Sequence, residues 1–153
     1  MFLLRLVKAL RANKVKFAIT GGYAVALHGA VRTTLDVDIV ISCTQESYQA
    51  AEAAMRSMGL VSRIPVRADE LFNFREEFIK NRNVKAWGFV HPDRPSEIVD
   101  VVITHNLDTL KITKVDVQGV EIPILDKQSL ISMKEDAGRP QDIEDISALK
   151  RLP

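Results

Sequence analysis

The chain has 153 residues, of which 46% are hydrophobic and 27% are charged. These values are ordinary for a globular domain and exclude a disordered or a fibrous chain. The formal net charge of +1 supplies no broad field for attracting nucleic acid, so we expect no sequence-specific DNA binding. The single cysteine, Cys43, excludes an intrachain disulfide and suits a reducing compartment. We therefore predict a cytoplasmic protein.

The amino-terminal segment, MFLLRLVKAL, predicts a helix rather than a signal peptide. Its apolar residues recur at helical spacing, and Arg5 and Lys8 interrupt the apolar run. The longest run without a charged residue, residues 17–31, contains three glycines and is too short to cross a bilayer. We expect no association with a membrane.

The next part of the chain alternates between strands and helices. Residues 15–19 predict a strand, which the segment Thr20-Gly21-Gly22 breaks. Residues 23–27 predict a short helix whose first backbone amides lie at the glycines. Residues 36–41 alternate as a second strand, and residues 44–59 contain a helix that Thr44 opens and Gly59 can terminate.

The middle of the chain is less regular. Residues 60–84 predict an amphipathic helix or a helical turn beside a lid-like loop. Residues 85–90 and 97–104 predict two strands joined as a hairpin by a turn-rich segment. The stretch 72–89 combines aromatic and basic residues, so it is either an acceptor-binding surface for nucleic acid or an element that packs its aromatic side chains inward.

The last part of the chain predicts one more hairpin and two helices. Residues 106–110 predict a single helical turn, and residues 114–117 and 120–124 flank a Gln-Gly turn. Residues 127–137 predict a helix, which Gly138-Arg139-Pro140 ends before the final helix begins.

Two aspartates stand in an otherwise apolar strand. Asp36 and Asp38 are two residues apart, so the alternation of a strand places both side chains on the same face. Neighbouring carboxylates repel one another unless a cation or a proton lies between them. Oxygen ligands without His or Cys favour Mg2+ or Mn2+ over zinc, and Mg2+ commonly takes its remaining ligands from substrate phosphates. The pair therefore predicts a metal site that handles a nucleotide.

A third aspartate, Asp100, lies in the apolar run 98–103, where a lone buried charge would be costly. If this strand lies beside the one that bears Asp36 and Asp38, the three carboxylates can hold two cations ~4 Å apart, as in enzymes of in-line displacement at phosphorus. Asp100 would then also help to deprotonate the attacking hydroxyl. The alternative is that the three aspartates are solvent-facing residues or salt-bridge partners.

The glycine pair fits the same interpretation. At Gly21 and Gly22, backbone N–H groups can approach phosphate oxygens because no Cβ stands in the way. An ordinary tight turn is the alternative, and the pair alone is weak evidence. Followed after thirteen residues by Asp36-x-Asp38, and by Asp100 in a later strand, it is far more specific.

This joint pattern resembles the minimal nucleotidyltransferases of the DNA polymerase beta superfamily, whose mark is G-[GS], a spacer, D-x-[DE] and a distant third carboxylate. The segment GGYAVALHG with the following RTTLDVD, and the tail LISMKEDAGRPQDIEDISALKRL, resemble the branch that includes the abortive-infection nucleotidyltransferase toxins. The resemblance implies an α/β (α+β) fold, with a mixed β-sheet flanked by helices and with C-terminal helices. It implies a single domain, 1–153, with a core over about residues 1–125 and a helical segment over about residues 126–153.

The resemblance also implies the roles of the acidic and glycine residues. By analogy with the family, Asp36 and Asp38 ligate both metal ions, and Asp100 completes the site as a ligand and a base. Gly21 and Gly22 cradle the triphosphate of the NTP donor.

The basic residues are weaker candidates. Lys134 is implied to reach the phosphates, although a solvated helix residue is an equal alternative, and Arg32 and Thr34 are candidates for nucleotide contact. Three charged residues near the last helix are interpreted as structural, at a helix end and in ion pairs. These are Arg139, Asp142 and Asp145.

The implied activity is transfer of a nucleoside monophosphate from an NTP to a hydroxyl acceptor, with Mg2+ or Mn2+ as cofactor and release of pyrophosphate. The acceptor stays open between RNA, a protein side chain and a small molecule, because these 153 residues hold no large additional domain for one of them. The alternative is a non-catalytic module that binds a nucleotide or a partner protein, as one half of a toxin and antitoxin pair.

Overall fold

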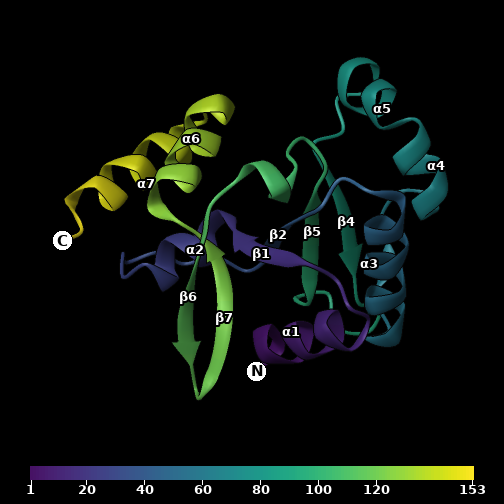
Figure 1. Cartoon of the computed structure of the whole chain (residues 1–153), viewed down its shortest axis with the longest axis horizontal. Coiled ribbons are helices and arrows are strands. Elements are labelled where there is room, and N and C mark those ends of the chain that lie inside the picture. The colour runs from purple at the N-terminus through teal and green to yellow at the C-terminus, as the bar shows by residue number, and fades with distance from the viewer.

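Seven strands form one mixed sheet in the computed structural model, which describes residues 1–153 (Figure 1). The strand order is β3-β4-β5-β2-β1-β7-β6. In chain order the elements are α1 (Phe2–Ala12), β1 (Phe17–Thr20), α2 (Gly21–Leu27), β2 (Val37–Ile41), α3 (Gln45–Ser57), β3 (Val61–Ser62), α4 (Ala68–Asn73), α5 (Arg75–Asn81), β4 (Ala86–Val90), β5 (Ile98–Val102), the 3-10 turn η1 (Leu107–Thr109), β6 (Ile112–Val117), β7 (Val120–Leu125), α6 (Lys127–Ala137) and α7 (Pro140–Arg151).

The pairing of the central strands sets the row of residues on which the site is built. β1 pairs with β2 antiparallel and places Thr20 opposite Asp38. β2 pairs with β5 parallel, with Asp38 opposite Asp100, and β5 pairs with β4 antiparallel, with Asp100 opposite Gly88. Residues in register on adjacent strands share a face of the sheet. Thr20, Asp38, Asp100 and Gly88 therefore form one row across four strands.

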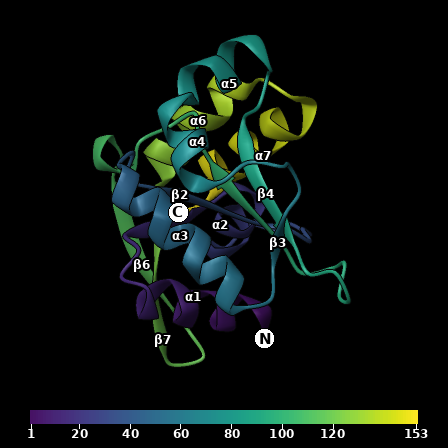
Figure 2. The same ribbon diagram turned by 90° about the vertical axis from the view of Figure 1, so that its right-hand side faces the viewer.

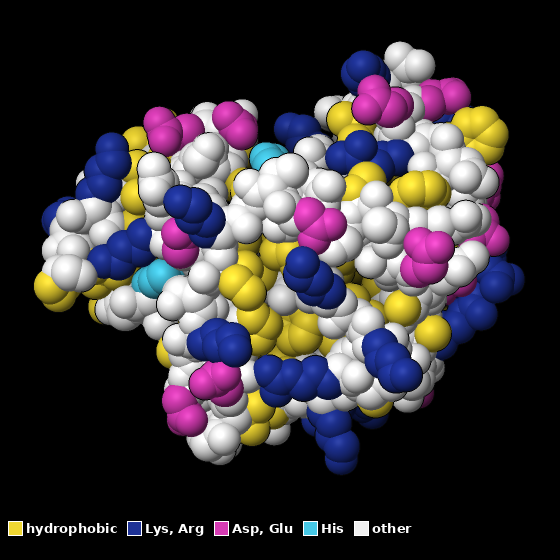
Figure 3. Space-filling model, in the orientation of Figure 1, with side chains coloured by type: hydrophobic (Ala, Val, Ile, Leu, Met, Phe, Trp, Pro, Cys, Tyr) yellow, Lys and Arg dark blue, Asp and Glu magenta, His cyan; other side chains and the backbone are white.

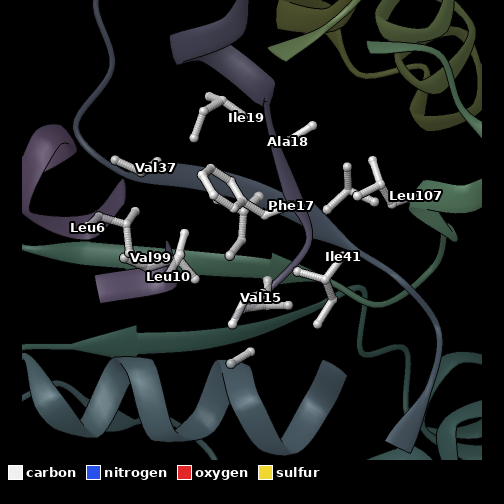
Figure 4. Packing of buried hydrophobic residues seen from close by; sticks show 14 of the residues in the cluster. Leu6, Leu10, Val15, Phe17, Ala18, Ile19, Val37, Ile41, Val99 and Leu107 are labelled. Atoms are coloured by element: carbon white, nitrogen blue, oxygen red, sulfur yellow. The ribbon is translucent and has the colours of Figure 1, made fainter. Parts of the chain in front are cut away.

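The opposite face of these strands is buried under α1 and α3. Trp87 of β4 is fully buried, stacks on Tyr48 of α3 with ring centroids 6.1 Å apart, and contacts Phe89 at 4.7 Å. Figure 2 shows α3 in front of the strands that it covers. Figure 4 shows Leu6 of α1 and Val99 of β5, both in the same buried cluster, between α1 and the sheet. The hydrophobic core thus fixes β4 and β5 and leaves their other face available.

The C-terminal helices and the α4–α5 pair stand at opposite ends of the sheet, at the upper left and upper right of Figure 1. In the same orientation the space-filling view is hollowed at its upper edge between these two groups (Figure 3). Basic and acidic side chains are interspersed over this face. None of the helices combines the length and hydropathy that crossing a bilayer requires.

The structure confirms the expected α/β class, the mixed sheet and the C-terminal helices, and differs in detail. The predicted strand 36–41 begins one residue later, at Val37, and α2 begins at Gly21 rather than after the glycines. Residues 60–84 hold two short helices and the strand β3, which pairs with the edge of β4. A strand of two residues has too few side chains for an alternation to be recognised. In this region Phe78 packs inward, whereas Phe74 is 56% exposed.

Replacing Trp87 by Ala tests the contribution of the aromatic cluster. We expect the free energy of unfolding to fall by about 3–5 kcal/mol, because the substitution removes a fully buried side chain and leaves a cavity. Urea unfolding followed by circular dichroism measures the change. Phe74→Ala, at an exposed aromatic side chain, is the control and should cost less than about 1 kcal/mol. Equal losses in the two variants would contradict this account of the core.

Candidate functional site

Three carboxylates meet on the open face of the sheet. Asp36 immediately precedes β2, Asp38 lies in β2 and Asp100 lies in β5. One carboxylate oxygen from each lies within 4.8 Å of the others. The convergence expected from the sequence is therefore present, because the parallel pairing of β2 with β5 brings together positions 62 residues apart in the chain.

The cluster concentrates negative charge at a partly buried position. Burial, followed by the nearby charges of Asp100 and Asp36, raises the pKa of Asp38 to about 7, although Lys134 and Arg139 act in the opposite direction. Burial is also the main cause that raises the pKa of Asp100, with the adjacent Asp36 adding to it. A divalent cation relieves this repulsion. The donor set, three carboxylates without His or Cys, fits Mg2+ or Mn2+.

The first glycine of the pair is required by the position of Asp38. Because Thr20 pairs with Asp38, the next residue, Gly21, lies against the Asp38 side chain. Gly21 has φ +64°, and a Cβ at this position would overlap Oδ2 of Asp38. A side chain here would both strain the backbone and displace the carboxylate. Gly21 is therefore part of the carboxylate site and not only of a turn.

The second glycine lies against the loop that precedes β2. A Cβ on Gly22 would stand 2.9 Å from Cβ of Thr34 and 3.2 Å from Cζ of Arg32. Thr34 donates its hydroxyl hydrogen to the backbone carbonyl oxygen of Asp36, at 3.4 Å. The loop therefore packs directly on the glycine pair, which places Arg32 and Thr34 next to the carboxylates.

A third glycine, Gly88, was not identified from the sequence. It is buried in β4 opposite Asp100, and a Cβ there would lie 3.1 Å from Oδ1 of Asp100 and 3.0 Å from Cδ of Arg63. Because glycine has no side chain, this position leaves room for the Asp100 carboxylate and for the aliphatic part of the Arg63 side chain. A lone glycine inside the predicted strand KAWGFV was the available signal, since glycine in a strand often marks a close approach.

The basic candidate on α6 is buried. Only 5% of Lys134 is exposed, so it is not the solvated residue that was one alternative. Its Nζ lies 2.8 Å from Oδ2 of Asp145 and 3.4 Å from Oδ1 of Asp142, and both carboxylates are almost fully buried. Asp142, Asp145 and the core residue Leu149 follow helical spacing, so two acidic residues at core positions of the last helix were the available signal.

Most of these groups line a single cleft with a volume of about 680 Å³. One wall is α6 and the start of α7, and the other includes Ala86 of β4 and Val102 of β5. Its volume is within the range of small-molecule and nucleotide sites. Every site residue predicted from the sequence lines it: Gly21, Gly22, Arg32, Thr34, Asp36, Asp38, Asp100 and Lys134.

A model of a known protein family matches the amino-terminal part of the chain. Residues 2–82 match the family model described as aminoglycoside-2″-adenylyltransferase. This range is more than half of the chain and contains the glycine pair, Asp36 and Asp38. No curated protein sequence matches the chain.

Solved structures share the whole fold at low sequence identity. The lincosamide antibiotic adenylyltransferase LnuA with bound lincomycin has a TM-score of 0.68 at 12% identity, over 99% of this chain and 96% of its own. ANT(2″)-Ia in complex with adenylyl-2″-tobramycin has a TM-score of 0.65 at 12% identity, over 96% and 84% of the two chains. An antigenic nucleotidyltransferase-like protein from Paracoccidioides brasiliensis has a TM-score of 0.57 at 17% identity, over 97% and 74%.

The raised pKa of Asp38 predicts a stability that depends on pH in the absence of divalent cations. In the folded protein the pKa of Asp38 is about 7, above the ordinary value of 3.8. The contribution of this carboxyl group to the free energy of unfolding is therefore complete below about pH 4 and is lost as the pH rises through 7. At pH 8 with a chelator, Asp38→Asn should therefore be more stable than the wild type, by on the order of 2 kcal/mol.

Urea unfolding of both proteins at pH 4.5 and pH 8 measures this difference. Comparing the two proteins cancels the opposite pH dependence of carboxyls whose pKa is lowered, such as Asp142 and Asp145. An Asp38→Asn protein that is no more stable than the wild type at pH 8 would contradict the repulsion described above.

Gly21→Ala should weaken binding of Mn2+ strongly, because the new methyl group displaces the Asp38 carboxylate. The control is Gly119→Ala, which also has a positive φ, of +83°, but has no atom within 4 Å of the new Cβ. Electron paramagnetic resonance of free Mn2+ in a titration measures both variants. Equal Mn2+ affinity in the two variants would contradict the claim that the close contact with Asp38 makes Gly21 necessary for the metal site.

Proposed function

Because the chain belongs to the aminoglycoside-2″-adenylyltransferase family and is thus an enzyme of the nucleotidyltransferase class, we propose that it transfers a nucleoside monophosphate from an NTP to a hydroxyl acceptor and releases pyrophosphate. The observation that carries this proposal is the cluster of Asp36, Asp38 and Asp100 beside the glycine pair, in a cleft of nucleotide size. ATP is the proposed donor, since the matched family is one of adenylyltransferases.

The three aspartates hold Mg2+ or Mn2+ in this proposal. When bound, the metal neutralises charge on the triphosphate and polarises the α-phosphate for in-line attack. Asp38 provides an oxygen ligand from β2, and Asp36 provides one from the position just before this strand. Asp100 provides a ligand from β5 and accepts the proton of the attacking hydroxyl.

The remaining predicted residues bind the nucleotide. Gly21 and Gly22 offer backbone that a phosphate can approach closely, and Thr34 contributes a hydroxyl on the same wall. Lys134 and Arg32 bring positive charge to the glycine side of the cleft. These groups together orient the donor so that the acceptor enters from the β4 and β5 side.

The acceptor is a hydroxyl compound that the cleft admits beside Asp100. ANT(2″)-Ia is described with adenylyl-tobramycin and LnuA with lincomycin, so an aminoglycoside and a lincosamide are the first small molecules to test. RNA and a protein hydroxyl are the other classes. No similar structure named above is described as a toxin, and the toxin and antitoxin interpretation stays a prediction from the sequence.

Transfer of label from α-32P NTPs, supplied one base at a time with Mg2+ or Mn2+, tests the proposal. The acceptors are tobramycin, lincomycin, total RNA and the protein itself. We expect a labelled product with the wild type and none with the Asp36→Asn/Asp38→Asn protein. Labelling that is equally strong in this double variant would contradict the proposal.

Asp100→Asn should lower the rate of transfer at saturating NTP by about 10³-fold or more, because it removes both a metal ligand and the proton acceptor. The matched control is Asp93→Asn in the β4–β5 connection, an exposed aspartate outside the cleft, which should retain the wild-type rate. Single-turnover kinetics with the acceptor found above measures both variants. A rate within about tenfold of the wild type in Asp100→Asn would contradict its assigned role.

A further inference from the structure

Three almost fully buried charges lie at the wall of the cleft or directly behind it. Lys134, Asp142 and Asp145 are 5%, 1% and 2% exposed. Burying charges costs free energy that an ion pair only partly returns, and apolar residues of similar volume commonly serve stability as well. A packing role is therefore a weak explanation for all three, and their neighbours indicate another.

The three charges belong to a chain of ion pairs with cations at both ends. Nε of Arg139 lies 2.8 Å from Asp142, and Nζ of Lys134 lies 3.4 Å from Asp142 and 2.8 Å from Asp145. Nε of Arg32 then lies 3.0 Å from Asp145. Three cations alternate with two carboxylates, so this series of ion pairs carries a net positive charge.

All three cations of these ion pairs line the cleft, whereas Asp145 lies behind its wall. Arg32 uses Nε for Asp145, and its guanidinium carbon lies 3.2 Å from the point where Gly22 would carry a Cβ. The Arg139 side chain is 72% exposed and acts electrostatically on Asp38. The positive charge is thus held at the glycine side of the cleft, next to the carboxylate cluster.

The carboxylate of Asp145 is built to hold two of these cations at once. It accepts hydrogen bonds from Lys134, Arg32 and Gln141. Burial by itself would raise the pKa of Asp145, but these contacts outweigh burial and keep the pKa below its usual value. Asp145 therefore stays charged in the folded protein and fixes where Arg32 and Lys134 lie.

We propose that Asp142 and Asp145 of α7 are positioning residues for nucleotide binding: through their ion pairs they hold Arg139, Lys134 and Arg32 where the phosphates of the NTP lie. This inference rests on the proposed function. Asp145 acts on Arg32 and Lys134, and Asp142 acts on Lys134 and Arg139. The last helix thereby completes the phosphate side of a site whose metal ligands come from β2, from β5 and from the residue just before β2.

The test is the dissociation constant of α,β-methylene-ATP with Mg2+, measured by calorimetry without an acceptor. Asp145→Asn should raise this constant by on the order of tenfold, because Arg32 and Lys134 lose the charge that holds them. Arg32→Gln should raise it by a similar factor. In the Arg32→Gln background, Asp145→Asn should add much less than it does alone, since part of its effect passes through Arg32.

Glu144→Gln is the matched control on α7, because Glu144 is exposed and has no side-chain partner. A role in stability alone predicts a lower free energy of unfolding for Asp145→Asn with a dissociation constant within about twofold of the wild type, and this result overturns the inference. If Asp145→Asn does not fold, Arg32→Gln decides, since Arg32 lies outside any helix or strand. An unchanged constant in Arg32→Gln overturns the inference as well.

The wild type separates the two proposals. If it binds the nucleotide and the variants bind equally well, the positioning role is wrong and the proposed function stands. If the wild type binds none of the NTPs with Mg2+ or Mn2+, the proposed function is contradicted, and the positioning role falls with it.

Discussion

Repulsion among three carboxylates is the constraint on which the site depends. The parallel pairing of β2 with β5 fixes Asp38 opposite Asp100, and the sharp turn after β1 presses Gly21 against Asp38. The buried side of the sheet holds this geometry, because Trp87 and its neighbours anchor β4 and β5 from the opposite face. A cluster that the fold cannot relax is relieved by a bound cation or by a proton, and so the scaffold itself favours a metal-dependent reaction at phosphate.

Much of the fold could be predicted because its elements carry local signals. The alternation around Asp38, the turn between the last two strands and the glycine at the end of α6 identify strands, a hairpin and a helix end without knowledge of tertiary contacts. The strand β3 carried no such signal, since two residues show no period. The two short helices between residues 68 and 81 were ambiguous because helices of 6 and 7 residues are too short to show a clear periodicity.

The candidate site could be predicted in its acidic half and only partly in its basic half. Asp100 was recognised because a carboxylate in an apolar strand needs an explanation, and this reasoning uses no contact. The pairing of Lys134 with Asp142 and Asp145 joins residues on two helices, so its geometry appears only after the helices pack. The role of Gly88 likewise depends on the register between β4 and β5, which cannot be read from the sequence.

The most direct test of the central claim is a crystal structure of the protein with Mg2+ and α,β-methylene-ATP. The account predicts Mg2+ bound by oxygens of Asp36, Asp38 and Asp100 and by the nucleotide, with the phosphates over Gly21 and Gly22. A nucleotide bound elsewhere, or a nucleotide in this cleft whose Mg2+ has no ligand from these aspartates, would contradict the claim that the carboxylate cluster is the catalytic metal site.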